Sequence, residues 1–270
     1  MGKQGSKMRR GPNKPQSLTK IATGVAGLDD ILEGGFPAGR TTLISGGPGT
    51  GKTTLACTFV LGACARGEKV VYVSFEESGP ALINAMLSPG VDLRPAVKAG
   101  CLEFLTIMPE AMGAEQHLIR ALARAKAFEP QHIVIDAISA LQRVGDTRAA
   151  FDYLMRLVDF AKQQGITTLM TNQLAGNFEQ IDFSGVGFSS LIDTIILLRF
   201  VEISDRLSRS LLVLKSRGAK HSNSYHRFVI TDNGIEITSM PSRAKLSELQ
   251  PQPLTAPSHA EVGVNQGGES

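Results

Sequence analysis

Cysteine is scarce in this sequence, and long apolar runs are missing from it. The 270 residues contain three cysteines (Cys57, Cys64 and Cys101), with no CxxC pair and no histidine at ligand spacing. We therefore expect reduced, mostly buried thiols in a cytoplasmic protein, and neither a disulfide framework nor a metal or redox site built on cysteine. No apolar run reaches the ~18 residues of a membrane helix, and no apolar segment follows the basic N-terminal residues, as a secretory signal would require.

Positive and negative side chains nearly cancel outside residues 1–20. The net charge is +3, but residues 1–20 hold six Lys and Arg and no acidic residue, whereas residues 21–240 carry a net charge of −2. The basic isoelectric point therefore reflects a tail and not a basic binding face. Two interpretations of this tail stay open: a solvated disordered segment, or a contact with nucleic acid or another acidic partner.

Composition and periodicity divide the chain into a domain and two tails. Residues 1–18 are almost free of apolar side chains, and residues 241–270 are rich in Pro, Ser, Gln and Gly, so we expect disordered tails around one domain at 19–240. Apolar strand-like runs at 40–45, 69–75, 101–107, 132–136 and 166–172 alternate with helical stretches at 52–66, 80–87, 114–128 and 148–164. This alternation predicts an α/β fold with a mostly parallel central sheet and helices on both faces.

The last third of the domain has a different rhythm. Strand candidates at 193–201, 209–215, 227–231 and 235–238 follow one another with short links and no helix between them. Asp232, Asn233 and Gly234 form a typical hairpin turn sequence. We therefore expect the sheet to end in antiparallel strands.

The segment GGPGTGKT at 46–53 follows a predicted strand and opens a predicted helix, which is the context that a P-loop requires. Its glycines let backbone N–H groups point at phosphates, and the helix N-terminus adds partial positive charge. Lys52 is expected to neutralise the β- and γ-phosphates, and the Thr53 hydroxyl to ligate Mg²⁺. The expected ATP-binding residues are Gly46, Gly47, Pro48, Gly49, Thr50, Gly51, Lys52, Thr53 and Thr54.

Three carboxylates follow buried strands and are candidates for the rest of this site. Asp136 ends the strand HIVID, at the sheet edge where the P-loop must lie, and is expected to support Mg²⁺. Glu76 and Glu77 follow the strand at 69–75 and face the same crevice, where one of them can orient or deprotonate the attacking nucleophile. Helix N-terminal glutamates are also common for dipole reasons, so the residues alone leave this second role open.

Two cations end a late strand. Lys215 and Arg217 are two residues apart and project to one side of it. They are either a salt-bridged surface stripe or ligands for the phosphates of a nucleotide held by a neighbouring subunit.

Residues 20–240 resemble the RecA-like superfamily and, within it, the KaiC family of circadian-clock ATPases. The stretches that carry the resemblance are TGVAGLDDILEGGFPAGRTTLISGGPGTGKTTL, VSFEES, LIDTIILLRFVE and LLVLKSRGAKH. The resemblance implies that Glu76 is the general base with Glu77 beside it, and it repeats the P-loop and Mg²⁺ roles given above. It also implies that Lys215, Arg217 and His221 approach ATP from the adjacent subunit of a hexamer. Ser189 and Ser190 fall on a self-phosphorylated Ser/Thr pair, and Ser184 on a nearby threonine.

The sequence also departs from that family's pattern. It holds one such domain instead of two in tandem, and the segment from Pro241 does not resemble the one that receives the clock's activating partner. Our main hypothesis is a ring-forming, Mg²⁺-dependent ATPase with Ser/Thr autokinase activity, acting as a regulatory switch with a protein partner. A recombinase-like DNA-binding ATPase is an alternative, although residues 173–190 contain no Lys or Arg to displace counterions from DNA. A non-hydrolysing nucleotide sensor is a third hypothesis.

Overall fold

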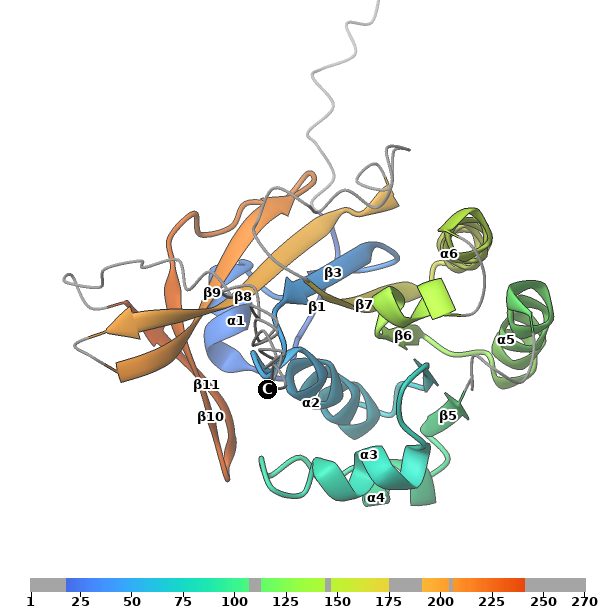
Figure 1. Cartoon of the computed structure of the whole chain (residues 1–270), viewed down its shortest axis with the longest axis horizontal. Coiled ribbons are helices and arrows are strands. Elements are labelled where there is room, and N and C mark those ends of the chain that lie inside the picture. Colours follow the sequence, from blue (N-terminus) through green and yellow to red (C-terminus); the bar gives the residue numbers. More distant parts are fainter. Residues whose placement is uncertain (1–17, 107–112, 144–146, 175–190, 204–205, 241–270) are drawn as a thin grey trace, which may run out of the picture.

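A nine-stranded sheet runs through the molecule in the order β11-β10-β9-β8-β3-β7-β6-β4-β5 (Figure 1). The computed structural model describes residues 18–106, 113–143, 147–174, 191–203 and 206–240. The strands of this sheet are β3 (Thr41–Gly46), β4 (Val70–Ser74), β5 (Leu102–Thr106), β6 (His132–Asp136), β7 (Thr167–Gln173), β8 (Thr194–Ile203), β9 (Arg206–Ser216), β10 (His226–Thr231) and β11 (Gly234–Ser239). Strands β8, β3, β7, β6, β4 and β5 are parallel, and β9, β10 and β11 continue the sheet in antiparallel fashion from β8. The predicted fold class is confirmed.

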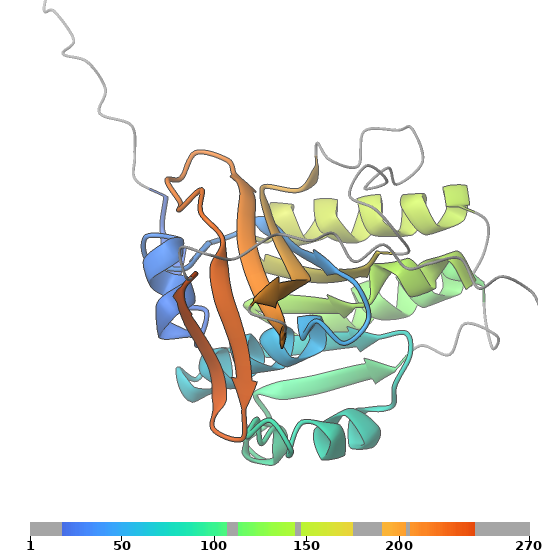
Figure 2. The ribbon, with the colours of Figure 1, turned by 60° about the vertical axis from the view of Figure 1, so that its left-hand side comes forward.

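Helices cover both faces of the parallel part of the sheet (Figure 2). They are α1 (Ala26–Ile31), α2 (Lys52–Ala65), α3 (Gly79–Ala85), α4 (Arg94–Lys98), α5 (Ala114–Phe128), the 3-10 helix η1 (Ile138–Arg143) and α6 (Thr147–Gln163). Helices α1 to α4 pack into one buried cluster, and α5, η1 and α6 into another. None of the helices in the described part of the chain has the length and apolar character needed to span a bilayer.

Alternating side chains of each central strand supply these two cores. Val70 and Tyr72 of β4 face the core of α2, whereas Val71 and Val73 face the core of α5 and α6. Such two-sided burial explains why the parallel strands read as continuous apolar runs. Cys57 and Cys64 also belong to the α2 core, as their seven-residue spacing indicates, and all three cysteines are free thiols.

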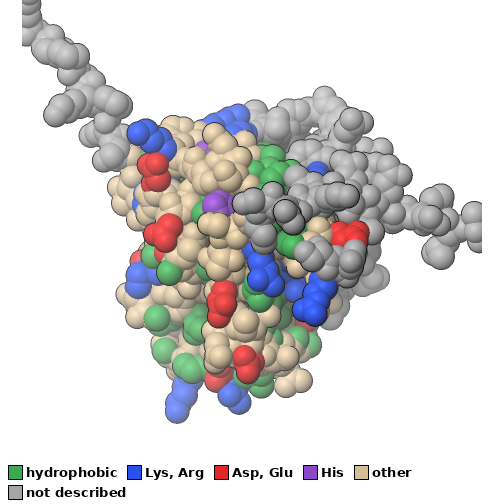
Figure 3. Space-filling view, turned by 90° about the vertical axis from the view of Figure 1, so that its left-hand side faces the viewer, with side chains coloured by type: hydrophobic (Ala, Val, Ile, Leu, Met, Phe, Trp, Pro, Cys, Tyr) green, Lys and Arg blue, Asp and Glu red, His purple; other side chains and the backbone are tan. Residues whose placement is uncertain are grey.

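The antiparallel strands β10 and β11 curve away from the direction of the central parallel strands (Figure 2). The β10–β11 hairpin turns at Asp232 and Asn233, as expected, with Thr231 paired to Gly234. Figure 3 views this end of the molecule, and its described surface carries basic and acidic side chains interspersed with each other. A small two-stranded sheet, β1 (Lys20–Ile21) with β2 (Phe36–Pro37), lies outside the main one.

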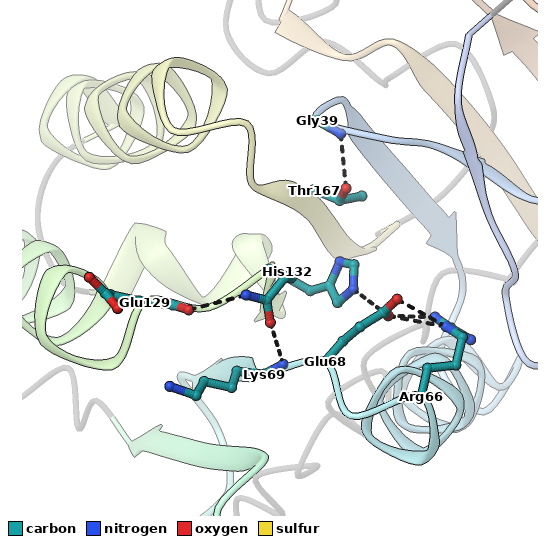
Figure 4. Close-up of polar contacts among 8 residues, drawn as sticks. Gly39, Arg66, Glu68, Lys69, Glu129, His132 and Thr167 are labelled. Atoms are coloured by element: carbon teal, nitrogen blue, oxygen red, sulfur yellow. Dashed lines mark hydrogen bonds and ion pairs between the residues drawn. The ribbon is translucent and has the colours of Figure 1, made fainter.

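A polar cluster lies at the edge where the parallel strands begin (Figure 4). The first residue of β6, His132, is buried, and its Nε2 lies 2.8 Å from Oε2 of Glu68. Glu68 also accepts hydrogen bonds from Nε and Nη2 of Arg66, with the shortest at 2.8 Å. The cluster joins the end of α2 to the start of β6, on the side of the sheet away from the P-loop.

Candidate functional site

The register of the parallel strands brings the carboxyl ends of β3, β4, β6 and β7 to one edge of the sheet. Gly46 pairs with Gln173 across β3 and β7, and Ser74 pairs with Asp136 across β4 and β6. The P-loop, Glu76 and Asp136 follow or end these strands, so they converge at that edge. Ligands of open α/β sheets bind in this position.

The P-loop joins β3 to α2 and closes tightly on itself. The Oγ1 of Thr50 and the Nζ of Lys52 both donate to the carbonyl oxygen of Gly47, each at 2.8 Å. Gly51 has a φ of 99°, a left-handed conformation that glycine adopts without steric cost. A Cβ at Gly46 would lie 2.5 Å from the carbonyl oxygen of Leu198, so only glycine fits between β3 and β8.

Lys52 is the buried cation of the site, with 8% of its surface exposed. Burial lowers the pKa of Lys52, while the negative charges of Asp136 and Glu76 act in the opposite direction. These two carboxylates therefore interact electrostatically with the ammonium group of Lys52. One ammonium group and two carboxylates that the sequence predicted for the site thus lie near one another.

Asp136 is held from both sides by hydroxyl groups. The OH of Tyr72 donates to Oδ2 at 2.6 Å, and the Oγ1 of Thr171 donates to Oδ1. Tyr72 is fully buried, and burial together with the neighbouring charge of Asp136 raises the pKa of its phenol. Periodicity in the sequence did not single out Tyr72 or Thr171, because each looks like one more alternating residue of a buried strand.

Glu76 and Glu77 both lie between β4 and α3, and both are exposed. The backbone N–H of Glu77 donates to Oγ of Ser74 at 3.2 Å, which fixes the turn. Glu77 also raises the pKa of the buried Cys57 thiol, after burial and Asp136. Glu76 therefore contributes to the field at Lys52, and Glu77 to the field at Cys57 within the α2 core.

The residues present fit a nucleotide with its magnesium ion. Thr53 is half-buried in the first turn of α2, and Asp136 ends β6, so the two supply a hydroxyl and a carboxylate oxygen. Hard oxygen donors of this kind suit Mg²⁺, which takes few protein ligands and completes its shell with phosphates and water. No group of three or more His, Cys, Asp or Glu side chains able to hold a metal occurs among the described residues.

Arg209 contacts the P-loop of its own chain, a contact that sequence reasoning missed. Its Nε donates to the carbonyl oxygen of Gly49 at 3.1 Å, and its guanidinium carbon lies 5.4 Å from the ring centroid of Phe200. Phe200 and Arg209 are cross-strand partners in the β8–β9 hairpin. No local pattern could reveal this contact, since it depends on how far the hairpin extends beyond the parallel edge.

Lys215 and Arg217 lie at the opposite edge of the sheet, and His221 follows them in the connection between β9 and β10. Lys215 pairs with Ile195 near the start of β8, and the N–H of Arg217 donates to the carbonyl oxygen of Asp193 at 2.9 Å. Burial lowers the pKa of Lys215, as does the neighbouring Arg217, whereas Asp193 raises it. The structure thus places the two cations close together but away from their own P-loop. Ser184, Ser189 and Ser190 lie outside the described residues.

Comparison with known proteins identifies the family of this chain. The family model "ATPase: KaiC" matches residues 21–242. The chain is 35% identical over 230 residues to the circadian clock protein KaiC2 of Synechocystis sp., covering 83% of this chain and 40% of that protein. It is 34% identical over 221 residues to the circadian clock oscillator protein KaiC of Synechococcus elongatus, covering 82% of this chain and 43% of that protein. This chain therefore spans about two fifths of the curated relatives that it matches, and it belongs to the KaiC family of ATPases.

Proposed function

We propose that this protein binds ATP with Mg²⁺ in the P-loop and hydrolyses it. The observation that carries the proposal is the convergence of Lys52, Asp136 and Glu76, in which both carboxylates influence the pKa of the buried ammonium group. An ammonium group inside a loop of backbone donors is suited to the triphosphate, and the two acidic groups are suited to its metal ion and to the attacking water.

Each residue has a distinct task in this proposal. Lys52 would stabilise the charge on the β- and γ-phosphates, and Thr53 and Asp136 would hold the magnesium ion. Bound Mg²⁺ would neutralise charge on the phosphate oxygens. Glu76, exposed at the crevice, accepts the proton of the attacking water or orients it. Arg209 supports the P-loop by holding the carbonyl group of Gly49.

The second half of the site comes from a neighbouring subunit in a ring, such as a hexamer. Strand β3 spans six residues between the two edges of the sheet. At the usual rise per residue, the edge that holds Arg217 lies roughly 17 Å from the P-loop edge. Lys215 and Arg217 therefore lie too far from their own P-loop, and a head-to-tail arrangement would bring them, with His221, to the nucleotide of the next subunit.

We extend the proposal to self-phosphorylation at Ser184, Ser189 or Ser190. The described chain resumes at Leu191, directly after Ser190, and reaches Asp193 at the same edge as Arg217. Asp193, three residues after Ser190 in the sequence, lies beside Arg217 at the edge that would face the nucleotide of the neighbouring subunit. Water and a serine hydroxyl are then competing acceptors for the same phosphoryl group.

One set of variants tests these assignments. Lys52→Ala should abolish Mg²⁺-dependent phosphate release from ATP, because the charge on the transferred phosphoryl group loses its main cation. Glu76→Gln should bind ATP with unchanged affinity and hydrolyse it about 100-fold or more slowly, as for the loss of a general base. Glu77→Gln is the matched control, and it should retain most of the turnover.

Incubation of the same proteins with ATP distinguishes water from serine as the acceptor of the phosphoryl group. Intact-mass measurement and peptide mapping after exposure to ATP should show phosphate on one of the three serines in the wild-type protein and none in Lys52→Ala. Wild-type turnover in Lys52→Ala would refute the ATPase proposal. An unmodified wild-type protein that turns over ATP would refute self-phosphorylation alone.

A further inference from the structure

Three neighbouring strands each contribute one polar side chain to the face of the sheet that α2 covers: two carry hydroxyl groups, and the one between them carries a carboxylate. Asp136 belongs to β6, which lies between β4 and β7. Tyr72 of β4 faces the α2 core, and so do Val134 and Leu169, which precede Asp136 and Thr171 by two residues each. Because side chains alternate along a strand, all three polar groups project to the side that carries the P-loop helix.

The carboxylate is clamped between these strands. Tyr72 donates to Oδ2 from one side at 2.6 Å, and Thr171 donates to Oδ1 from the other. A carboxylate has about four lone-pair positions on its two oxygens. The two hydroxyls occupy one position on each oxygen and leave the others for a cation or its bound water. The pair of hydrogen bonds also prevents the carboxylate plane from rotating.

The hydrogen bond to Asp136 is the main polar contact of the Tyr72 hydroxyl group. The side chain is fully buried, with its ring 5.5 Å from that of Phe104 in the core. Its hydroxyl also lies 3.9 Å from the thiol of Cys57, a weak hydrogen-bonding group. A phenylalanine would fill the same space and make the same ring contact. The hydroxyl therefore has a role apart from packing.

We propose that Tyr72 is a positioning residue for the magnesium site: its hydroxyl, together with that of Thr171, fixes the orientation of Asp136 toward the metal ion. This inference rests on the proposed function, because it assigns Asp136 to Mg²⁺. Groups that orient metal-binding side chains commonly change metal affinity about 10- to 100-fold when they are removed.

The structure offers a matched control for each hydroxyl. Tyr153 is also buried, on the opposite face of the sheet, and its hydroxyl has no hydrogen-bond partner among the described residues. Thr168 lies on β7 like Thr171, and its buried hydroxyl likewise has no partner in the part of the chain that the structure describes. Tyr153→Phe and Thr168→Val therefore remove a buried hydroxyl without disturbing Asp136.

The experiment measures Mn²⁺ binding by electron paramagnetic resonance in the presence of saturating ADP, with the full-length protein. Tyr72→Phe should raise the Mn²⁺ dissociation constant about tenfold over the wild type, since one of the two constraints on Asp136 is lost. Its affinity for ADP without metal should stay unchanged. Tyr153→Phe should match the wild type in both measurements.

The outcomes separate the inference from the proposed function. If Tyr72→Phe binds Mn²⁺ as tightly as Tyr153→Phe, even with a lower thermal midpoint, the hydroxyl has a structural role only and the inference is overturned. If Tyr72→Phe does not fold, Thr171→Val against Thr168→Val decides in the same way, with equal Mn²⁺ affinities overturning the clamp. A wild-type protein that binds ADP but no Mn²⁺ would overturn both the inference and the proposed magnesium site.

Discussion

His132 shows how a single buried residue ties stability to pH in this fold. Its ring packs edge-on against Phe59, with centroids 5.1 Å apart, and its Nε2 meets the carboxylate of Glu68. Burial lowers the pKa of His132, while Glu68 raises it and the positive charge of Arg66 lowers it further. The net direction is downward, so the folded protein favours the neutral imidazole.

The sign of the pH effect follows from that direction. An unfolded histidine gains its proton near pH 6.5, whereas the folded His132 resists it until a lower pH. The free energy of unfolding should therefore fall as the pH drops below about 6.5, since the unfolded state binds more protons. Glu68 adds to this loss in stronger acid, because hydrogen bonds from Arg66 and His132 outweigh its desolvation and lower its pKa.

His132→Gln isolates the contribution of the imidazole. Glutamine can still donate to Glu68 but does not titrate, so the variant should lose less stability than the wild type between pH 7.5 and pH 5.5. Urea unfolding at both pH values provides the measurement. Equal losses in the two proteins would contradict a depressed pKa at His132.

At the scale of elements, the sequence predicted what is long and periodic. Helix α5 and strand β6 have the expected bounds, and the other predicted strands and helices are displaced by only a few residues. Helices α1 and α4 were not predicted because six and five residues make less than two helical turns, and strands β1 and β2 because they contain two residues each. Helices of this length and two-residue strands cannot display their periods.

Both strands of the β8–β9 hairpin were predicted, but their full length was not. Leu198 pairs with Gly46, but β8 continues to Ile203 and β9 returns from Arg206. The hairpin therefore extends beyond the parallel edge and places Arg209 beside the P-loop. Register across strands decides this, and the residues of one strand do not encode it locally.

This reach predicts a role for Arg209 in nucleotide binding. Arg209→Ala should raise the dissociation constant for ATP about tenfold, because a charge-assisted hydrogen bond that holds the P-loop is lost. Arg206→Ala, on the same strand but at the exposed end of the hairpin, is the control and should bind ATP like the wild type. Isothermal titration of both variants checks the prediction, and equal affinities would remove Arg209 from the site.

At the scale of the whole molecule, the two ends of the parallel strands carry the two groups of residues that we propose to meet between neighbouring subunits. The P-loop and Asp136 lie at the carboxyl edge, and Lys215 and Arg217 at the amino edge. Their separation follows from the parallel alignment of β3 and β8, combined with the reversal at β9. The sequence predicted both groups of residues, but only the register shows that they lie at opposite ends of the parallel strands.

Mixing two inactive variants tests this division. Lys52→Ala lacks a working P-loop, and Arg217→Ala lacks the group offered to its neighbour. In rings assembled from equal amounts of both, about a quarter of the interfaces should join an intact P-loop to an intact Arg217 if contacts run head to tail. Phosphate release should recover to a similar fraction of the wild-type rate. No recovery, in mixtures shown to contain both variants in one assembly, would contradict the shared site.

The opposite placement of these groups has a kinetic consequence. A subunit separated from its neighbours would retain its own P-loop but would lack the neighbouring cations that complete the site. Turnover per subunit would then fall on dilution, and the rate would rise more steeply than linearly with protein concentration until the rings are full. The turnover rate per subunit in the cell would then depend on how abundant the protein is.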